Sequence, residues 1–209
     1  MTDFSKLSLA DFLGSLASEA PTPGGGTAAA VAGAMGAALA QMVSALTLTR
    51  EKYASAHEAL RPIAEAAKAA RTELIALARE DAEAYDAVVA ARRLPRENPE
   101  EKAERSRRVA EANRRATDVP MRTARAAVRL LTMLPELVEK GNPNAASDAG
   151  SAALLLEAAA GAALLNVGVN LSGISDEGLV GELQRETADL QTEAQRLRDQ
   201  VLASVRRTF

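Results

Sequence analysis

The stretch that most constrains the fold is residues 21–49, which contain no charged side chain. It opens with two prolines and three consecutive glycines. These residues favour an irregular loop, because proline lacks a backbone N–H and glycine leaves the backbone free. From Thr27, a candidate N-cap, small residues recur about every four positions and predict a helix over 27–49. A helix face of alanine and glycine predicts close packing against neighbouring helices.

The glycine loop before this helix has two interpretations. It can present free backbone N–H groups and the positive end of the helix dipole to an anion or a carbonyl group. It can also be only a tight loop that leads the chain into a central helix. We therefore treat Pro23, Gly24, Gly25 and Gly26 as candidate binding residues with a structural alternative.

Composition predicts an all-α protein. Of the 209 residues, 47% are hydrophobic but only 2% are aromatic. The core must then consist of Ala, Leu, Val and Met, which suits closely spaced helices better than a sheet. The length fits one domain over 1–209. We expect an up-and-down bundle of long alanine-rich helices.

Charge and residue usage argue against several functional classes. The net charge of −3 gives no reason to expect nucleic acid or an anionic membrane as a partner. There is no cysteine, and the single histidine, His57, which we place at the surface, cannot form a multi-histidine metal site within one chain. We expect no signal peptide and a cytoplasmic location. Residues 21–49 could span a bilayer by length, but they lack flanking anchors on both sides, so we expect a core helix.

Caps and prolines divide the rest of the chain into further helices. We expect a short helix from near Ser8 and, after a break near Pro62, a long helix over 62–93. The next helix begins at Asn98 and Pro99, and a new start at 118–120 continues to Gly141 with a kink at Pro135. A small-residue helix follows the turn 141–148, and a last helix begins at about Ser175. The last helix carries an apolar 3-4 seam from Leu183 to Val201, which packs either within the bundle or against a second subunit.

The segment 92–129 is basic, with twelve Lys and Arg residues against six acidic ones. Several Glu and Arg residues stand four positions apart in the order that stabilises a helix, so much of this segment is a solvated face. Arginines left unpaired, such as Arg107 or Arg122, could bind an acidic ligand. No aromatic residue is interleaved with them, which argues against single-stranded nucleic acid.

Asp81 is the best candidate for acid–base chemistry. It falls within an apolar stripe that includes Leu77 and Val88, and desolvation there should raise the pKa of the carboxyl group toward values useful for proton transfer. The alternative is a buried residue that pairs two helices. Tyr85, one turn later, either bonds a ligand or fills the core. Asp148 is a second candidate, although it can also serve only as a helix cap.

Asn166 and Asn170 are two amides one turn apart in an otherwise apolar helix. Buried amides need partners, so they bond either to facing helices or to a ligand. Asp148 lies 18 positions before Asn166 (166 − 148 = 18), which is about 27 Å along a continuous helix. Only a long ligand, or contributions from two subunits, would bring both into one site.

Four motifs in this order resemble one known family: PTPGGGTAAAVAGAMGAALAQMV, then DAEAYDAV followed by RLP, then DVP, then GNPNAASDAGSAALLLEAAAGAALLNVGVNL. They are similar to the C-terminal domain family of formiminotransferase-cyclodeaminase, and the match covers nearly the whole chain. The resemblance implies a helical, folate-dependent enzyme that forms homodimers. It also implies a folate site at residues 23–26, Asp81, Asn144, Ser147 and Asp148.

Two reactions are compatible with this resemblance. In the first, a formimidoyltetrahydrofolate cyclodeaminase releases ammonia and forms 5,10-methenyltetrahydrofolate. In the second, a methenyltetrahydrofolate cyclohydrolase gives 10-formyltetrahydrofolate. We expect no metal and no cofactor beyond the tetrahydrofolate substrate, whose glutamate carboxylates, in single or polyglutamylated form, could bind the basic segment. A non-catalytic folate-binding or helical interaction protein is the alternative of another class.

Overall fold

The computed structural model describes residues 6–208, and this range contains helices and loops but no strand. The helices are α1 (Leu9–Leu16), α2 (Gly25–Leu48), η2 (Glu51–Ala56), α3 (His57–Arg92), α4 (Pro99–Leu131), α5 (Leu134–Lys140), η3 (Pro143–Ala145), α6 (Ala146–Leu171) and α7 (Glu177–Arg206). The prediction of an all-α protein is confirmed. Part of the N-terminal sequence on which the signal-peptide prediction rests lies outside the described residues.

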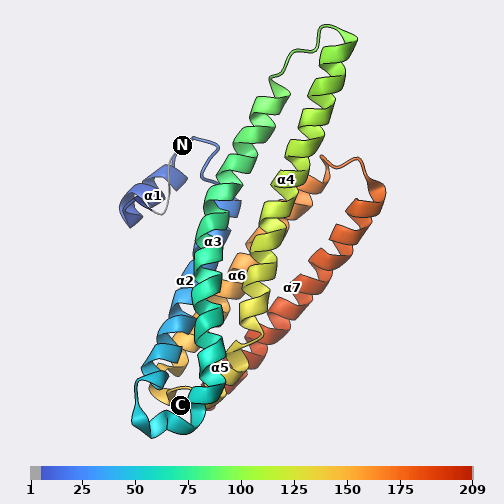
Figure 1. Ribbon diagram of the computed structural model, residues 1–209. Helices are drawn as coiled ribbons and strands as arrows, with labels where there is room; N and C mark the ends of the chain where they lie inside the picture. The colour runs from blue at the N-terminus through green and yellow to red at the C-terminus, as the bar shows by residue number, and fades with distance from the viewer. Residues whose placement is uncertain (1–5, 209) are drawn as a thin grey trace.

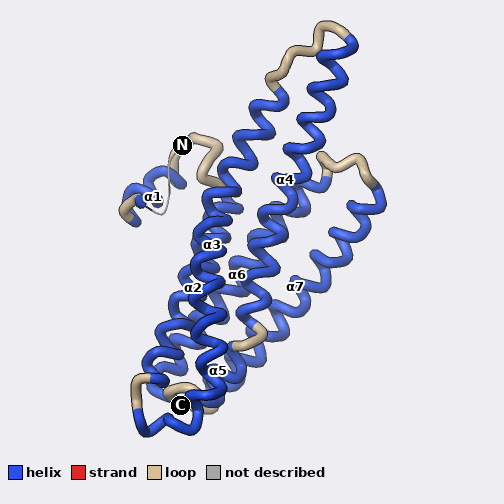
Figure 2. The backbone as a smooth tube through the Cα atoms, in the orientation of Figure 1, coloured by secondary structure: helices blue, strands red, loops and turns tan. Residues whose placement is uncertain are grey.

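The five long helices alternate in direction along one axis and form an up-and-down bundle (Figure 1). The connections lie at the two ends of the bundle, and α3 and α4 extend beyond the other helices as a hairpin (Figure 2). Helix α2 packs mainly on α3 and α6, α4 packs on α3 and α6, and α7 packs on α6. The short α1 lies beside the bundle.

Small residues let α2 approach its neighbours closely. The core positions Ala30, Ala37 and Ala40 are fully buried. A Cβ atom on Gly36 would lie 2.9 Å from the Cγ atom of Leu156 and 3.0 Å from the carbonyl oxygen of Ala152. These distances are shorter than ordinary van der Waals contact. The predicted small-residue face of α2 is therefore the face that packs on α6.

Two prolines expected to break helices lie inside them. Helix α3 begins at His57 and includes Pro62, and α4 runs without interruption through Pro120. Each proline removes one helical hydrogen bond, but Leu60 and Ile63 near Pro62, and Val119 and Met121 on either side of Pro120, are buried in the core. This burial outweighs the loss. His57, expected at the surface, is half-buried, and its Nε2 atom is buried without a hydrogen-bond partner in the part of the chain described.

The apolar seam of α7 packs within the bundle. Ala194, Leu197 and Val201 are buried, and Leu190 is partly buried against the core. Their neighbours are α6, α4 and α5. Of the two interpretations left open for this seam, the structure supports the intramolecular one, so the seam gives no support to a dimer.

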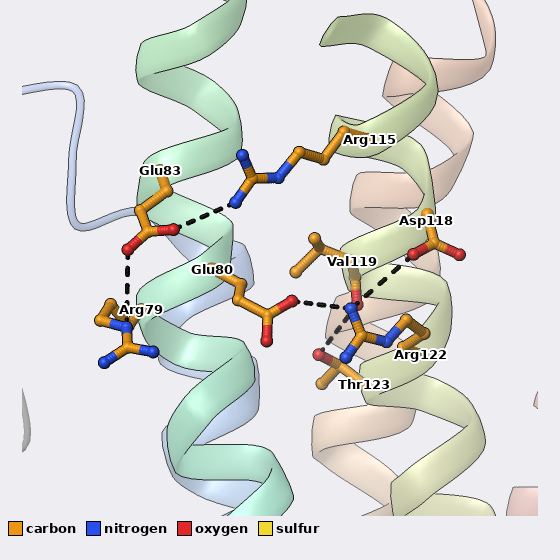
Figure 3. Close-up of polar contacts among 8 residues, drawn as sticks. All are labelled: Arg79, Glu80, Glu83, Arg115, Asp118, Val119, Arg122 and Thr123. Atoms are coloured by element: carbon orange, nitrogen blue, oxygen red, sulfur yellow. Dashed lines mark hydrogen bonds and ion pairs between the residues drawn. The ribbon is translucent and has the colours of Figure 1, made fainter. Parts of the chain in front are cut away.

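Ion pairs connect α3 to α4, and Figure 3 shows those of Arg115 and Arg122. Glu80 accepts a hydrogen bond of 2.7 Å from Arg122, and Glu83 accepts one of 3.0 Å from Arg115. We expected Arg122 and Arg107 to be unpaired, but both are paired. Arg122 binds Glu80, and Arg107 binds Glu104 of its own helix at 2.7 Å. The arginines are more than one-third exposed, so these pairs add little stability.

The packing of α2 predicts opposite effects of alanine at two helical glycines. Gly36→Ala should lower the free energy of unfolding by about 1–3 kcal/mol, because the new methyl group meets Leu156 and the α6 backbone. Gly181→Ala, in α7, should raise it by roughly 0.5–1 kcal/mol, because its nearest neighbour is the flexible end of Arg185 at 3.7 Å. Urea denaturation of both variants measures the difference, and equal stability of the two would contradict the packing described.

Candidate active site

A pocket of about 450 Å³ lies where the start of α2, the second half of α3, the middle of α4 and the end of α6 meet. Its lining brings together seven of the predicted site residues: Gly24, Gly25, Gly26, Asp81, Tyr85, Asn166 and Asn170. The other lining residues are Pro21, Thr22, Val88, Arg92, Asn113, Ala116, Val169, Ser172 and Gly173. Segments that are distant in sequence thus form one cavity.

The glycine segment begins helix α2 instead of preceding it. Gly24 is the N-cap, and Gly25 and Gly26 are the first two helical residues, so Thr27 is not the cap that the sequence suggested. The Thr27 hydroxyl donates a hydrogen bond of 2.9 Å to Oδ2 of Asp81 instead. The first N–H groups of α2 have no partner within the helix, and they lie at the wall of the pocket.

The two helical glycines have different roles. A Cβ atom on Gly26 would overlap the Asp81 carboxylate, so only glycine permits this close approach of α2 to α3. A Cβ atom on Gly25 would lie 3.5 Å from Nδ2 of Asn166, an ordinary contact distance. Gly26 therefore leaves room for the Asp81 carboxylate, and Gly25 lies next to the Asn166 amide at the pocket wall.

Asp81 has the chemical properties that the sequence predicted. It is half-buried on α3, one turn after the buried residues Leu77 and Ala78. Burial raises the pKa of the Asp81 carboxyl group, and hydrogen bonds from the Thr27 hydroxyl and backbone N–H only partly oppose this shift. A carboxyl group of this kind holds its proton to a higher pH than an exposed aspartate and can transfer it to a bound ligand.

The two asparagines of α6 differ in their hydrogen bonds. Asn170 Nδ2 donates 2.6 Å to the carbonyl oxygen of Ala116, and Asn113 of α4 donates 2.9 Å to the carbonyl oxygen of Gly173. These two bonds tie the end of α6 to α4. Asn166 Nδ2 donates 2.9 Å to Ala162 in its own helix, and its side chain lines the pocket. Asn170 thus has a structural partner, while Asn166 faces the pocket beside Gly25.

Sequence reasoning missed Arg92 and Asn113, which line this pocket, and Thr27, which is buried and bonds Asp81. Arg92 was counted only as part of the basic segment, although within residues 6–208 no carboxylate pairs with its guanidinium group. Thr27 was assigned to the cap, and Asn113 had no signal in a polar helical segment. Tyr85 lines the pocket and is 43% exposed, so it does not fill the core.

The remaining predicted residues lie outside this pocket. Asn144, Ser147 and Asp148 are at the other end of α6, about 27 Å from Asn166 by the helical rise. Pro23 is buried beside the pocket and lines a neighbouring cavity between α1 and α3. The candidate site is therefore divided between the two ends of one helix within a single chain.

The turn at the start of α6 is held by a buried polar network. Asn142 is 4% exposed, and its Oδ1 atom accepts 2.8 Å from the Tyr53 hydroxyl and 3.1 Å from the backbone N–H of Asn144. Its own N–H donates 2.9 Å to the Thr47 hydroxyl. The side chain of Asp148, in contrast, has no hydrogen-bond or ion-pair partner within residues 6–208. The network fixes a turn whose polar side chains remain available.

Comparison with known proteins places this architecture in a family. The family model described as Formiminotransferase-cyclodeaminase matches residues 8–189. A methenyltetrahydrofolate cyclohydrolase from Methylorubrum extorquens is 42% identical over 93% of this chain and 94% of that protein. A formimidoyltransferase-cyclodeaminase from Sus scrofa is 33% identical over 89% of this chain, which corresponds to only 34% of that protein.

A solved structure agrees with these matches. The crystal structure of formiminotetrahydrofolate cyclodeaminase from Thermotoga maritima superimposes with a TM-score of 0.86, covers 97% of both chains and is 33% identical in sequence. Both the sequence and the fold therefore show that this chain belongs to the formiminotransferase-cyclodeaminase family.

Proposed function

We propose that this protein is a folate enzyme that acts on the one-carbon unit between N5 and N10 of tetrahydrofolate, as a formimidoyltetrahydrofolate cyclodeaminase. The observation that carries the proposal is Asp81, a half-buried carboxyl group with a raised pKa, which lines a pocket at the N-terminus of α2. The full-length likeness to the Thermotoga maritima cyclodeaminase supports this reaction.

The reaction needs a proton at the departing nitrogen. N10 attacks the formimidoyl carbon on N5 and forms a tetrahedral centre, which then loses ammonia and leaves the methenyl bridge between N5 and N10. The departing nitrogen must be protonated before its bond to carbon breaks. Protonated Asp81 supplies that proton, because burial keeps the carboxyl group protonated at a higher pH than an exposed aspartate. Turnover then falls as the pH rises through the pKa of Asp81.

Hydrolysis of the methenyl bridge is the second candidate function. The relative that is 42% identical over nearly the full length of both chains is named a methenyltetrahydrofolate cyclohydrolase, and this observation favours the second reaction. Water attacks the methenyl carbon, and Asp81 accepts one proton from the water. Asp81 then returns this proton to N5 as the bond between carbon and N5 breaks, while the hydroxyl group loses its remaining proton to solvent and becomes the carbonyl group of the 10-formyl product. With Asp81 as a base, turnover falls as the pH decreases through its pKa.

The pocket suits the pterin end of the substrate. Its volume of about 450 Å³ lies in the usual range for small-molecule sites. Asn166, Tyr85 and the first N–H groups of α2 supply donors and acceptors for a heteroaromatic ring. The chemistry described uses side chains of this protein alone, so we propose that no metal and no further cofactor is required. Dialysis against a chelator should leave activity unchanged.

Arg92 suits the other end of the substrate. It is the last residue of α3, lines the same pocket and is exposed, with no carboxylate partner within the described residues. A guanidinium group binds a carboxylate with two hydrogen bonds, and folate ends in one or more glutamates. We place the first glutamate of the substrate at Arg92 and any polyglutamate tail along the basic hairpin. We also propose a homodimer in the cytoplasm, without a nucleic-acid or membrane partner.

A direct assay decides the function. Purified protein is supplied with 5-formimidoyltetrahydrofolate and, separately, with 5,10-methenyltetrahydrofolate, and both the absorbance of the methenyl group and released ammonia are measured. Ammonia release in step with methenyl formation supports the cyclodeaminase. Loss of methenyl absorbance above the spontaneous rate supports the cyclohydrolase. Tetrahydrofolate binding without turnover of either substrate would leave a binding protein.

Asp81→Asn should separate catalysis from stability. We expect turnover to fall by about 10²–10⁴-fold, the usual range for a proton-transfer group, with substrate affinity largely kept. The folded protein binds the Asp81 proton more tightly than the unfolded chain does. Ionisation of Asp81 therefore lowers the free energy of unfolding as the pH rises from 3.8, the ordinary pKa of an aspartate, through the raised pKa of the folded protein. Asparagine cannot ionise, so the melting temperature at neutral pH should stay equal or increase.

Asp86→Asn is the matched control for this variant. Asp86 lies on the same helix but is exposed and lies outside the pocket lining. Its replacement should leave both turnover and melting temperature unchanged. Near-normal turnover of Asp81→Asn at saturating substrate would remove Asp81 from the reaction.

Arg92→Gln should affect substrate binding and not chemistry. Loss of a carboxylate partner predicts a rise in KM of about 10-fold or more with little change in kcat, and a larger effect with a polyglutamylated substrate. Arg93→Gln removes the same charge from the adjacent position, outside the pocket lining, and should change KM little. Equal effects of the two substitutions would indicate only a general loss of positive charge.

A further inference from the structure

Pro120 removes a hydrogen-bond donor from α4 at the wall of the pocket. In an α-helix the N–H of residue 120 bonds the carbonyl oxygen of residue 116, and proline has no N–H. Pro120 is buried inside α4, so Ala116, which lines the pocket, keeps a carbonyl group without its helical partner. Such a group needs a donor from elsewhere. The proline therefore creates a free acceptor at a defined point on α4.

Asn170 of α6 supplies the missing donor. Its Nδ2 atom donates a hydrogen bond of 2.6 Å to the carbonyl oxygen of Ala116. A carbonyl oxygen can only accept, so the amide must turn its nitrogen toward Ala116 and its oxygen away from it. No donor within residues 6–208 bonds that oxygen, and Asn170 lines the pocket. Pro120 thus determines which end of the Asn170 amide is left for a ligand.

A second bond of the same contact uses a carbonyl group that is free for another reason. Asn113 of α4 donates 2.9 Å to the carbonyl oxygen of Gly173, which lies beyond the end of α6 at Leu171. A Cβ atom on Gly173 would lie 2.7 Å from Nδ2 of Asn113, so this close approach requires glycine. The two bonds run in opposite directions between α4 and α6. Together they fix the position of Asn170 relative to α4.

Asn166 has the same orientation one turn earlier on α6. Its Nδ2 atom donates 2.9 Å to the carbonyl oxygen of Ala162, and no donor in the described part of the chain bonds its oxygen. Residues one turn apart on a helix have Cβ atoms about 5–6 Å apart. Two amide oxygens at this spacing can accept hydrogen bonds from two N–H groups on one edge of a ring. The first N–H groups of α2, at the adjoining wall, act as donors.

We propose that Pro120 is a positioning residue of the pocket. It directs the amide oxygen of Asn170 toward the ligand, and this oxygen and that of Asn166 accept hydrogen bonds from the edge of the pterin that carries the 2-amino group and N3–H. The inference rests on the proposed function, since it assigns an orientation to the pterin of the folate substrate.

This orientation agrees with the position of Asp81. The carbonyl oxygen at C4 of a pterin follows N3 along the same edge, so it faces the first N–H groups of α2. N5 is the ring nitrogen nearest to C4, and Gly26 at the start of α2 lies against the Asp81 carboxylate. The amino edge at α6 and the oxygen at α2 therefore leave N5, which carries the one-carbon unit, on the side of Asp81.

Pro120→Ala tests the positioning role. Alanine restores an N–H that bonds Ala116 within α4 and releases the Asn170 amide. We expect KM to rise by about 5–10-fold, the effect of one lost hydrogen bond, with little change in kcat. Pro62→Ala makes the same change inside α3, at an exposed position outside the pocket lining, and should leave KM unchanged. Equal KM values of the two variants would overturn the role of Pro120.

A double variant distinguishes positioning from a general effect on the fold. Asn170→Ala alone should raise KM by a similar factor, and it tests the acceptor without any change in α4. Adding Pro120→Ala to Asn170→Ala should have no further effect on KM, because Pro120 acts through Asn170. Multiplication of the two separate effects would overturn the coupling of these residues.

A modified ligand tests the orientation of the ring. Tetrahydrofolate without its 2-amino group should bind the wild type about 10-fold more weakly than tetrahydrofolate, because an acceptor in the pocket loses its donor. Asn170→Ala should bind the two ligands with nearly equal affinity. The same loss of affinity in both proteins would overturn the assignment of the amino edge to α6.

Nuclear magnetic resonance tests the role of Pro120 without activity or ligand. The side-chain amide signal of Asn170 is identified by its absence from the spectrum of Asn170→Ala. Its hydrogens should exchange with water about 10-fold faster in Pro120→Ala than in the wild type, because the bond to Ala116 is lost. Equal exchange rates would overturn the proposal. An inactive wild type would refute the proposed function, and the exchange measurement would still decide whether Pro120 holds Asn170.

Discussion

The close approach of α2 to its neighbours is the constraint on which the rest of the structure depends. Gly36 and the alanines of α2 leave no room for larger side chains against α6, so the helix can take only one axial position. That position places Gly26 against the Asp81 carboxylate and Gly25 against Asn166. The geometry of the pocket is therefore a consequence of backbone packing between helices, and not of a flexible loop.

The packing of α2 on α3 buries the Asp81 carboxyl group, and this burial lowers the stability of the folded protein. A carboxylate near the bundle core loses hydration, and the hydrogen bonds from Thr27 compensate for only part of the lost hydration energy. The raised pKa of Asp81 in the folded protein reflects this incomplete compensation. A hydrophobic side chain at this position would suit the core better. A polar residue that violates the pattern of its helix is the kind of position where function overrides stability.

Much of the fold could be predicted from the sequence, because apolar periodicity and helix caps are local signals. Asn98 caps α4 and Ser8 caps α1 as expected. The errors arose where tertiary burial decided the outcome. Pro120 lies inside a continuous helix because its flanking residues are buried, and Thr27 bonds Asp81 instead of capping α2. A local pattern contains no information about a partner 54 residues away.

The candidate site could be predicted only in part for the same reason. Asp81 stood out because a charged residue within an apolar stripe is visible in one helix. Arg92 did not, because its lack of a carboxylate partner becomes apparent only when the surrounding helices are placed. The assignment of Asn144, Ser147 and Asp148 came from motifs alone. These residues lie about 27 Å from Asn166 along α6, because a motif fixes residue types and spacing but not which residues of a helix share one pocket.

The two reactions proposed for this pocket share one tetrahedral carbon bonded to N5, N10 and a third heteroatom. In the cyclodeaminase the third heteroatom leaves as ammonia, and in the cyclohydrolase it arrives as water, so it occupies the same position beside the proton-transfer group. A single carboxyl group with a raised pKa serves either direction of proton transfer, as a donor below that pKa and as an acceptor above it. The difference between the two activities therefore depends on which species the pocket admits beside Asp81 and on its protonation at the working pH, not on a different set of catalytic groups.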